Sequence, residues 1–521
     1  MSTLRRRWLA VALLGAAACG SGSLAPGAEL RVLAGSELRD LEPYLKQIQK
    51  YAKVGVTLQY SGTLAGIDRL NAGEQFDAVW FSHAKYLILS DAGRSRVKAQ
   101  ERIMLSPVVL GIKQSKARAF GWIDNPNVTW ADIAARVKAG QLHYAMTNPT
   151  ASNSGFTAVI GVAAALSHSA SALTAGDINA AALRDFFQGQ ALTAGSSGWL
   201  AEAYTRDQDR LDGMINYESI LLSLNHGGEL HEPLVLIYPK EGIVTADYPL
   251  VLLNEAKRDA YTRLVTYLRT PDFQRTLMTA TFRRPVSPDV PLDAAFPKAL
   301  IVELPFPSDL GVVDRILDSY LTEQRRPAHS YFLLDVSGSM EGPRMRELQL
   351  AINTLAGDDS SLTGRFAKFQ PRERVTILTF SDQVTDRQEF DLGDAAQAPR
   401  TRETIKGYVG ALHAGGRTAL FSSLEGTYNA ALLARRTDPQ RYFSVVLMTD
   451  GQSNTGASLA DFRRYYESLR PADRDIKVFP IVFGEADRRE LQAVASLTGG
   501  RLFDGNTTQL AAVFKEIRGY Q

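Results

Sequence analysis

The sequence predicts an α/β protein made of more than one compact unit. At 521 residues the chain is long enough for about three such units. Short apolar runs alternate with amphipathic runs of helical period along most of its length, which is typical of parallel strands covered by helices. Several apolar runs end in hydroxyl or carboxylate residues. Polar groups should therefore gather at the carboxyl ends of the strands, where open parallel sheets bind ligands.

The composition is that of an ordinary globular protein and argues against some functions. The chain has 58 Lys and Arg residues against 56 Asp and Glu residues. This balance indicates neither nucleic-acid binding nor a strongly polyanionic partner. The seven His residues are scattered, and His226 with His231 has no second pair of ligands nearby, so we expect no zinc site.

The amino terminus has the layout of an export signal that ends at the only cysteine. Three arginines at 5–7 precede an apolar stretch at 8–18, which is too short to span a bilayer. With Cys19 next, the segment resembles a bacterial lipoprotein box, although Ala16 stands where that family prefers an aliphatic residue. The resemblance implies a lipid on Cys19 and anchoring to the cell membrane or envelope. Cleavage after the alanines, which would give a soluble secreted protein, is the alternative.

We therefore assign residues 1–19 to the signal and lipid box, and residues 20–28 to a flexible tether rich in Gly and Ser. No later apolar run is long enough to span a bilayer, so we expect no other segment to cross a membrane.

Apolar runs at 29–33, 54–60 and 76–81 predict the first three strands. Helical patterns follow at 37–51 and around 67–70, so this region should contain parallel α/β units. Glycine and hydroxyl residues stand in the turns after the strands: Ser36, Ser61, Thr63 and Ser82. Such turns offer hydroxyls and backbone N–H groups to a polar ligand, or merely cap the next helix, and both interpretations stay open.

A second lobe is expected to begin near residues 107–111. Its elements are a hydroxyl-rich turn at 147–155, an apolar helix at 156–166, strands at 212–217 and 233–239, an amphipathic segment at 255–268 and the terminating motif Phe-Arg-Arg-Pro at 282–285.

These motifs, in this order, resemble the type II periplasmic solute-binding proteins, in particular those for molybdate-like oxyanions. The resemblance covers residues 29–305 and implies two lobes that close on a ligand held by hydroxyls and backbone amides. Carried over to this sequence, the candidate ligand contacts are Ser36, Ser61, Thr63, Ser154 and Tyr217. For Tyr217 the alternative is an ordinary half-buried tyrosine. The flanks of these turns differ from the molybdate binders, so the identity of the solute stays open.

Residues 306–327 link this unit to the last one, with a short helical pattern at 312–321 between proline-containing breakers. The last unit should be a doubly wound sheet with helices on both faces. We expect its strands at 331–336, 374–380, 443–449 and 477–483, and its helices at 345–356, 401–413, 420–434 and 488–498.

Oxygen-bearing side chains stand at three points of this unit. Asp335, Ser337 and Ser339 follow the first apolar strand, Thr418 follows a pair of glycines, and Asp450 follows the third strand. These are hard ligands, which suit an ion such as Mg²⁺ better than zinc or copper. We expect the carboxylates at an exposed sheet edge. The alternative is that they only cap helices.

This arrangement resembles the metal-ion-dependent adhesion site of von Willebrand factor A domains, over residues 328–521. The resemblance implies a Rossmann-like fold that binds Mg²⁺, or Mn²⁺ or Ca²⁺. It also implies that the two serines and the threonine bind the metal directly, with the aspartates acting largely through water. An Asp or Glu carboxylate of a protein partner would fill the open position on the metal.

The sequence thus favours an envelope-anchored binding protein whose last unit grips an acidic group on a protein partner, together with a solute-binding unit. A solute receptor of an ABC-type importer, with an accessory A domain, is the second hypothesis. A metal-dependent enzyme is third. Ser337 occupies the place where an aspartyl-phosphate enzyme needs a carboxylate, and the chain has no phosphate-binding loop or nucleophile elbow.

Overall fold

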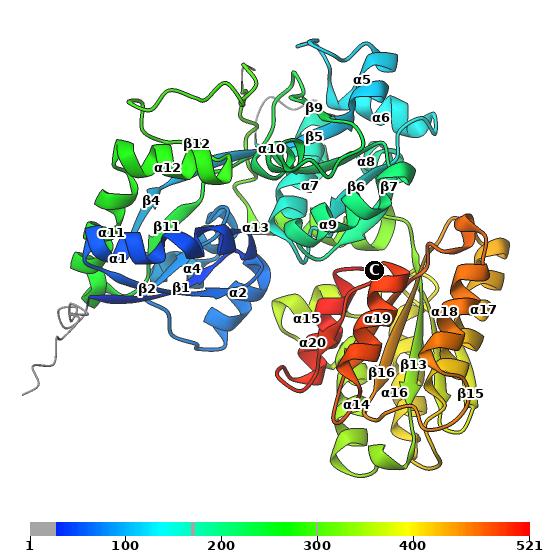
Figure 1. Cartoon of the computed structure of the whole chain (residues 1–521). Helices are drawn as coiled ribbons and strands as arrows, with labels where there is room; N and C mark the ends of the chain where they lie inside the picture. Colours follow the sequence, from blue (N-terminus) through cyan, green and yellow to red (C-terminus); the bar gives the residue numbers. More distant parts are fainter. Residues whose placement is uncertain (1–27, 168–171, 299–300) are drawn as a thin grey trace, which may run out of the picture.

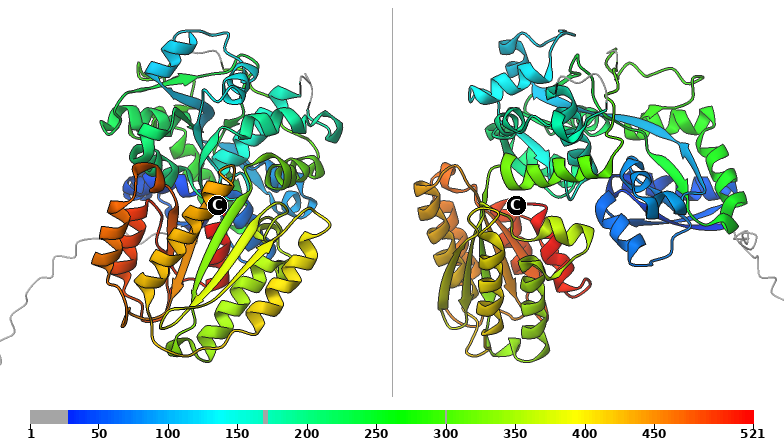
Figure 2. Two further views of the ribbon diagram at one scale, coloured as in Figure 1. Left: turned by 90° about the vertical axis from the view of Figure 1, so that its right-hand side faces the viewer. Right: turned by 180° about the vertical axis from the view of Figure 1, so that it is seen from behind.

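The computed structural model describes residues 28–167, 172–298 and 301–521. Cys19 and the expected signal lie outside these residues. The fold is α/β, as the sequence predicts: a two-lobed region is followed by a third α/β unit that packs beside both lobes (Figures 1 and 2). No helix within the described ranges is long and apolar enough to span a membrane.

The first lobe is built on a mixed five-stranded sheet. β1 (Glu29–Ala34) pairs in parallel with β2 (Gly55–Tyr60) and with β3 (Ala78–Trp80), as the alternating pattern predicts. The later strand β11 (Pro249–Leu252) runs antiparallel between β3 and β4 (Ala99–Arg102). The chain therefore returns to this lobe after building most of the second.

The second lobe has a seven-stranded sheet whose longest strand, β5 (Met104–Lys113), also leads out of the first lobe. The other strands are β6 (Tyr144–Thr147), β7 (Gln190–Ala194), β8 (Gly213–Tyr217), β9 (Leu234–Ile237), β10 (Thr245–Ala246) and β12 (Arg284–Pro285). Every residue of helix α7 (Asn153–Leu166) is buried, which explains why its sequence is apolar on all sides.

The remaining helices of the two lobes lie around these sheets (Figure 1). The helix expected at 37–51 is divided, because Pro43 lies inside a 3-10 segment, η1 (Ser36–Tyr44), before α1 (Leu45–Ala52) begins. The others are α2 (Thr63–Asn71), α3 (Lys85–Leu89), α4 (Asp91–Arg96), α5 (Gln114–Phe120), α6 (Trp130–Lys138), α8 (Ala180–Phe187), α9 (Ser197–Asp207), α10 (Glu218–Gly227), α11 (Arg258–Leu268) and α12 (Pro271–Thr281).

The third unit has a six-stranded sheet in the order β15-β14-β13-β16-β17-β18. β13 (Ala328–Asp335) pairs in parallel with β14 (Arg374–Phe380) on one side and β16 (Tyr442–Thr449) on the other, and β17 (Lys477–Val482) continues beyond β16. The strand order therefore reverses at β13, as in a doubly wound sheet. Edge strands β15 (Val384–Asp391) and β18 (Phe503–Asp504) were not expected from the sequence.

Helices cover both faces of this sheet (Figure 2). They are α14 (Pro343–Asn353), α15 (Leu362–Ala367), α16 (Ala398–Gly410), α17 (Leu420–Thr437), α18 (Leu459–Ser468), α19 (Arg488–Thr498) and α20 (Leu510–Arg518). Of these, α15, α18 and α20 were missed by the sequence interpretation.

The segment between the lobes and the third unit is ordered as helix α13 (Leu310–Ser319) and the π-helical turn η5 (Tyr320–Gln324). The apolar side chains of Val313, Ile316 and Leu317 on α13 are fully buried, and α13 contacts α7 of the second lobe. The third unit is thus packed against the lobes rather than suspended from them.

Candidate metal site and solute cleft

The five candidate metal-site residues lie at the carboxyl ends of the central strands β13 and β16. Asp335 is the last residue of β13, and Asp450 directly follows Thr449 at the end of β16. Both strands are buried along nearly their whole length and are adjacent in the sheet, so their ends are held side by side. This is the switch point of the strand order, where ligands collect in such folds.

Hydrogen bonds join four of these residues into one cluster. Ser337 N donates to Asp335 Oδ1 at 2.8 Å, and the Ser337 and Ser339 hydroxyl oxygens are 3.1 Å apart. Ser339 Oγ in turn donates to Asp450 Oδ1 at 2.7 Å. Thr449 Oγ1, which the sequence interpretation did not include, donates to Asp335 Oδ2 at 2.6 Å.

The loop that carries Thr418 is tied to the same place. Gly338 N donates to Gly416 O at 3.0 Å, and Gly416 has φ +85°, a conformation that favours glycine. A Cβ on Gly451 would lie 3.5 Å from Ser339 Oγ and 3.7 Å from Thr418 Oγ1. Gly451 thus lies near both the Ser339 and Thr418 hydroxyls, which places Thr418 beside the serines.

Both carboxylates of the cluster are fully buried, with 0% exposure, so the expectation of an exposed sheet edge is wrong. Burial raises the pKa of Asp335, and the nearby Asp450 raises it further, while hydrogen bonds from Thr449 and Ser337 act in the opposite direction.

Arg344 is part of the cluster and was missed by the sequence interpretation. It lies in the first turn of α14, and its Nη1 donates to Asp450 Oδ2 at 2.7 Å. Its side chain is one-third exposed. In the sequence Arg344 is one of several arginines after the serine motif, and no local signal distinguishes it. Only the fold directs it at Asp450.

The donor set fits a small hard cation. It combines three hydroxyls with two carboxylates, and oxygen ligands of this kind are those that Mg²⁺ and Ca²⁺ prefer. Within the described residues no group of three or more His, Cys, Asp and Glu side chains could hold a metal ion. A metal at this site would therefore depend on the hydroxyls of Ser337, Ser339 and Thr418 as well as on the carboxylates.

The candidate solute contacts lie where the two lobes meet, but they are not all equivalent. Thr63 begins α2 of the first lobe, and its backbone N–H donates to Asn153 Oδ1 of the second lobe at 2.8 Å. A Cβ on Gly62 would lie 2.5 Å from Ala151 O, so the lobes touch at this turn. Ser36 and Ser61 are half-buried in the turns after β1 and β2.

The other two candidates lie on the second lobe. Tyr217 is fully buried at the end of β8, and its hydroxyl has no hydrogen-bond partner among the residues described. The Ser154 hydroxyl is bonded within its own lobe, to Thr147 Oγ1 at 2.9 Å and to Ser197 Oγ at 2.7 Å. Tyr217 is thus available to a ligand, whereas Ser154 already has partners.

Glu37, Tyr248 and Arg283 lie in the same region between the lobes and were not among the expected contacts. Asn153 Nδ2 donates to Glu37 Oε1 at 3.4 Å, and the Tyr217 and Tyr248 ring centroids are 6.0 Å apart. Arg283 Cζ is 5.1 Å from the Tyr248 ring centroid. Arg283 belongs to the Phe-Arg-Arg-Pro motif, which could have indicated it. Glu37 follows Ser36 directly, and a carboxylate is not a residue expected in an oxyanion site.

His83, fully buried beside Thr157 of the second lobe, makes stability depend on pH. Burial lowers its pKa to about 3, and its Nε2 lies 3.1 Å from Thr157 Oγ1. In the unfolded chain His83 binds a proton near pH 6.5, whereas in the folded chain it does not. The free energy of unfolding therefore falls as the pH drops below 6.5. We expect a loss of about 1 kcal/mol between pH 6.5 and 5.5 from this residue.

This prediction is checked by following the unfolding midpoint against pH for the full chain and for His83→Gln. In His83→Gln the midpoint should depend less steeply on pH. The remaining pH dependence comes from groups such as buried His329, whose pKa burial also lowers to about 3. The exposed His231, changed to Gln, is the control and should keep the wild-type slope. An unchanged slope in His83→Gln contradicts the assignment.

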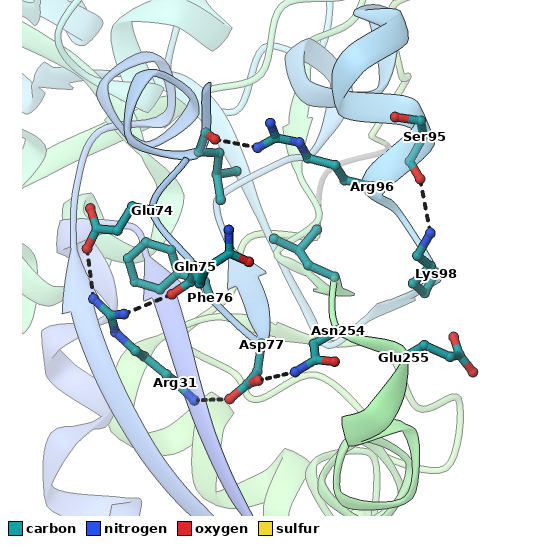
Figure 3. A pocket seen from close by; sticks show the side chains of 12 residues that line it. Arg31, Glu74, Gln75, Phe76, Asp77, Ser95, Arg96, Lys98, Asn254 and Glu255 are labelled. Carbon is teal, nitrogen blue, oxygen red and sulfur yellow. Dashed lines mark hydrogen bonds and ion pairs between the residues drawn. The ribbon is translucent and has the colours of Figure 1, made fainter. Parts of the chain in front are cut away.

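A separate surface pocket of about 570 Å³ lies on the first lobe (Figure 3). Its three cations are bonded to the protein itself. Arg31 pairs with Glu74 at 2.7 Å, Lys98 Nζ donates to Ser95 O at 3.1 Å, and Arg96 donates to Leu70 O. Because these three side chains are already engaged within the protein, we do not assign the pocket as a ligand site.

Comparison with protein families separates the chain into two parts. Residues 30–283 match the model of the bacterial extracellular solute-binding protein family, and residues 331–516 match the model of the von Willebrand factor type A domain. These ranges lie inside the units expected at 29–305 and 328–521. No curated protein matches the chain.

Solved structures of both kinds resemble parts of the chain. The periplasmic binding protein AfuA from Actinobacillus pleuropneumoniae, with fructose-6-phosphate bound, is 14% identical over 56% of this chain and 97% of its own, with a TM-score of 0.42. The ferric binding protein from Campylobacter jejuni is 12% identical over 56% of this chain and 96% of its own, with a TM-score of 0.43. A von Willebrand factor type A protein from Catenulispora acidiphila is 20% identical over 38% of this chain and 43% of its own, with a TM-score of 0.29.

Proposed function

We propose that this chain, which joins an extracellular solute-binding domain to a von Willebrand factor type A domain, is an envelope-anchored binding protein. Its A domain uses a divalent metal to grip an acidic group on a protein partner, and its solute-binding domain modulates that interaction. The observation that carries the proposal is the meeting of Asp335, Ser337, Ser339, Thr418 and Asp450 at one end of the sheet.

The neutral and the charged residues of the site would have different roles. The hydroxyls of Ser337, Ser339 and Thr418 would hold the ion directly, and Asp335 and Asp450 would balance its charge. A bound Mg²⁺, or Mn²⁺ or Ca²⁺, supplies a coordination position for an Asp or Glu carboxylate of the partner. Because the direct ligands are neutral, such an ion keeps its attraction for an incoming anion. Arg344 adds positive charge beside Asp450, which also favours an acidic partner.

Contacts between the domains support modulation by the solute. On the first lobe, Asp68 of α2 accepts hydrogen bonds from the backbone N–H groups of Leu362 and Thr363 at 3.0 and 2.7 Å, at the start of α15. On the second lobe, Asn148 Nδ2 donates to Arg518 O at 3.4 Å, at the end of α20. The A domain therefore bridges both lobes, so a change in their separation has to alter at least one of these contacts.

The proposal places the protein at the cell envelope. Membership of residues 30–283 in an extracellular family accords with export, and a lipid on Cys19 would hold the protein at the membrane. Mass spectrometry of the mature amino terminus tests the anchor. An unmodified terminus removes the lipid from the proposal and leaves a secreted protein.

Capture of partners from the native envelope tests the central claim. We expect the full-length protein to retain a protein partner in Mg²⁺, to release it in EDTA and to recover it when Mg²⁺ returns. Ser337→Ala should lose the partner, because it removes a hydroxyl from the ion's position. Ser468→Ala, at the exposed end of α18, is the matched control. Capture that survives both chelation and Ser337→Ala contradicts the proposal.

A solute receptor of an ABC-type importer is the second candidate. It is favoured by the match of residues 30–283 to the solute-binding family and by the contact between the lobes at Thr63 and Asn153. Uptake of a solute that is lost on deletion of the protein and unaffected by Ser337→Ala would favour it. Both domain types are typically non-enzymatic, which favours binding over catalysis.

A further inference from the structure

The region where the two lobes meet contains a carboxylate that is poorly neutralised by its neighbours. Glu37 follows the turn after β1, and its carboxylate folds back so closely that a Cβ on Gly35 would lie 2.6 Å from Glu37 Oε1. The side-chain hydrogen bond that it accepts comes from neutral Asn153 and is long, 3.4 Å. Burial raises the pKa of Glu37, although Arg283 and this hydrogen bond oppose the change.

The buried cation beside Glu37 is Arg283, whose two terminal nitrogens are engaged and whose Nε has no partner among the described residues. Arg283 is 1% exposed; its Nη1 pairs with Asp40 Oδ2 at 2.6 Å, and its Nη2 donates to the Glu37 carbonyl oxygen at 3.0 Å. Two carboxylates, Glu37 and Asp40, therefore face one guanidinium. When both carboxylates are ionised, this group of three residues has one net negative charge, which repels an oxyanion and attracts a cation.

Several hydroxyls around this charge are buried without partners. Thr63 Oγ1, Ser82 Oγ, Tyr217 OH and Tyr248 OH complete no hydrogen bond to a described residue, although Ser82 stands beside Tyr217 and Arg283 beside Tyr248. Buried polar atoms are nearly always bonded, so four such atoms in one place point to a ligand that would complete them. Thr63 comes from the first lobe and Tyr217 from the second, so a solute bound here would contact both.

The chemistry of these groups selects the kind of ligand. An ammonium group has three donors and no acceptor, and carboxylate and hydroxyl oxygens can accept all three. An aromatic face attracts cations as well, and the Tyr248 ring already has the Arg283 guanidinium over it, which leaves the Tyr217 ring for a ligand. An oxyanion would find hydroxyl donors but would also meet the charge of Glu37.

We propose that the region between the lobes binds a small organic cation, whose primary ammonium group sits on Glu37 and is shared with the hydroxyls of Thr63, Tyr217 and Tyr248. This inference rests on the proposed solute-binding role and names its ligand class. This ligand class differs from the oxyanions bound by the protein family that the sequence motifs resemble. The reason is Glu37, which directly follows Ser36 in the first ligand turn.

Calorimetric titration of the full-length protein tests the inference. The probes are 1,4-diaminobutane, ethanolamine and lysine as amines, molybdate, sulfate and phosphate as oxyanions, and glucose as a neutral solute. We expect at least one amine to bind and to raise the unfolding midpoint, since a ligand that binds only the folded state stabilises it. No oxyanion should bind more tightly than the best amine.

Variants then identify the residues. Glu37→Gln should weaken amine binding at least tenfold, whereas Glu42→Gln, exposed on the same segment η1, should bind as wild type does. Tyr217→Phe should weaken binding without lowering the ligand-free midpoint, because the hydroxyl that it removes has no partner among the described residues. This second variant keeps the test decisive if Glu37→Gln folds poorly.

Three results overturn the inference, and they are distinct from one another. If oxyanions bind, and Glu37→Gln strengthens their binding, the site takes anionic rather than cationic solutes. If no probe of any class binds, both the ligand class and the solute-binding role are wrong. Amine binding that is unaffected by Glu37→Gln and Tyr217→Phe also overturns the assignment, because the amine is then bound elsewhere.

Discussion

Glu373→Gln is expected to lower the free energy of unfolding of the A domain by about 3–5 kcal/mol, because it leaves two buried arginines without their counter-charge. Glu373 is 1% exposed and is bonded to both. Arg518 Nη2 donates to its Oε1 and Oε2 at 2.8 and 2.6 Å, and Arg325 pairs with Oε1. Burial alone would raise the pKa of Glu373, but these two cations hold it below its usual value.

The location of this triad makes the effect extend beyond one domain. Arg325 follows the linker turn η5, Glu373 precedes β14, and Arg518 ends α20. Loss of the Glu373 charge should weaken the packing of η5, β14 and α20 against one another. Beyond α20, Gly519 lies against Ala151 of the second lobe, so the docking of the domains should weaken as well.

Chemical denaturation and scanning calorimetry of the full chain measure this change. For a domain of this size the expected loss corresponds to a fall of roughly 10 °C in the midpoint of the A-domain transition. Glu389→Gln, on the exposed edge strand β15 of the same sheet, should shift stability by no more than about 0.5 kcal/mol. A loss below about 1 kcal/mol in Glu373→Gln would mean that water or other groups stabilise the arginines.

Mg²⁺ should stabilise the A domain, and Asp335→Asn should abolish that effect. At a metal concentration ten times the dissociation constant, a single site adds about 1.4 kcal/mol, or roughly 3–5 °C in the midpoint. Asp335→Asn removes charge from the site but keeps its shape, including an oxygen that can accept from Ser337 N. Without metal it should be no less stable than wild type, because it removes one of two carboxylates buried in the same cluster.

Arg344→Gln should act in the opposite direction and tighten metal binding. Its guanidinium nitrogen lies 2.7 Å from Asp450 Oδ2, so its positive charge opposes a cation held by the same carboxylate. Calorimetric titration with Mg²⁺ and Mn²⁺ on the full-length protein and both variants gives the comparison. No binding by wild type at millimolar metal would contradict the site. Equal binding by wild type and Arg344→Gln would contradict the role of the arginine alone.

Local sequence signals predicted much of the third unit because they are strong there. The strand expected at 374–380 is β14, and the helix expected at 488–498 is α19, with the same bounds. Apolar runs of this length and type fix an element without information from distant parts of the chain. Edge strand β15 was not predicted, because its residues are nearly all exposed and show no apolar alternation.

By itself the sequence determined the α/β class and placed Asp335 and Asp450 at strand ends, because a buried strand and the polar residue after it are neighbours in the chain. The tertiary structure decided what surrounds them. It buried both carboxylates, aimed Arg344 at one of them, and placed Glu37 beside Arg283 across 246 positions of sequence. Strands β11 and β4 likewise pair only after the chain returns from the second lobe. Charge balance and burial depend on contacts between distant segments, so no local pattern records them.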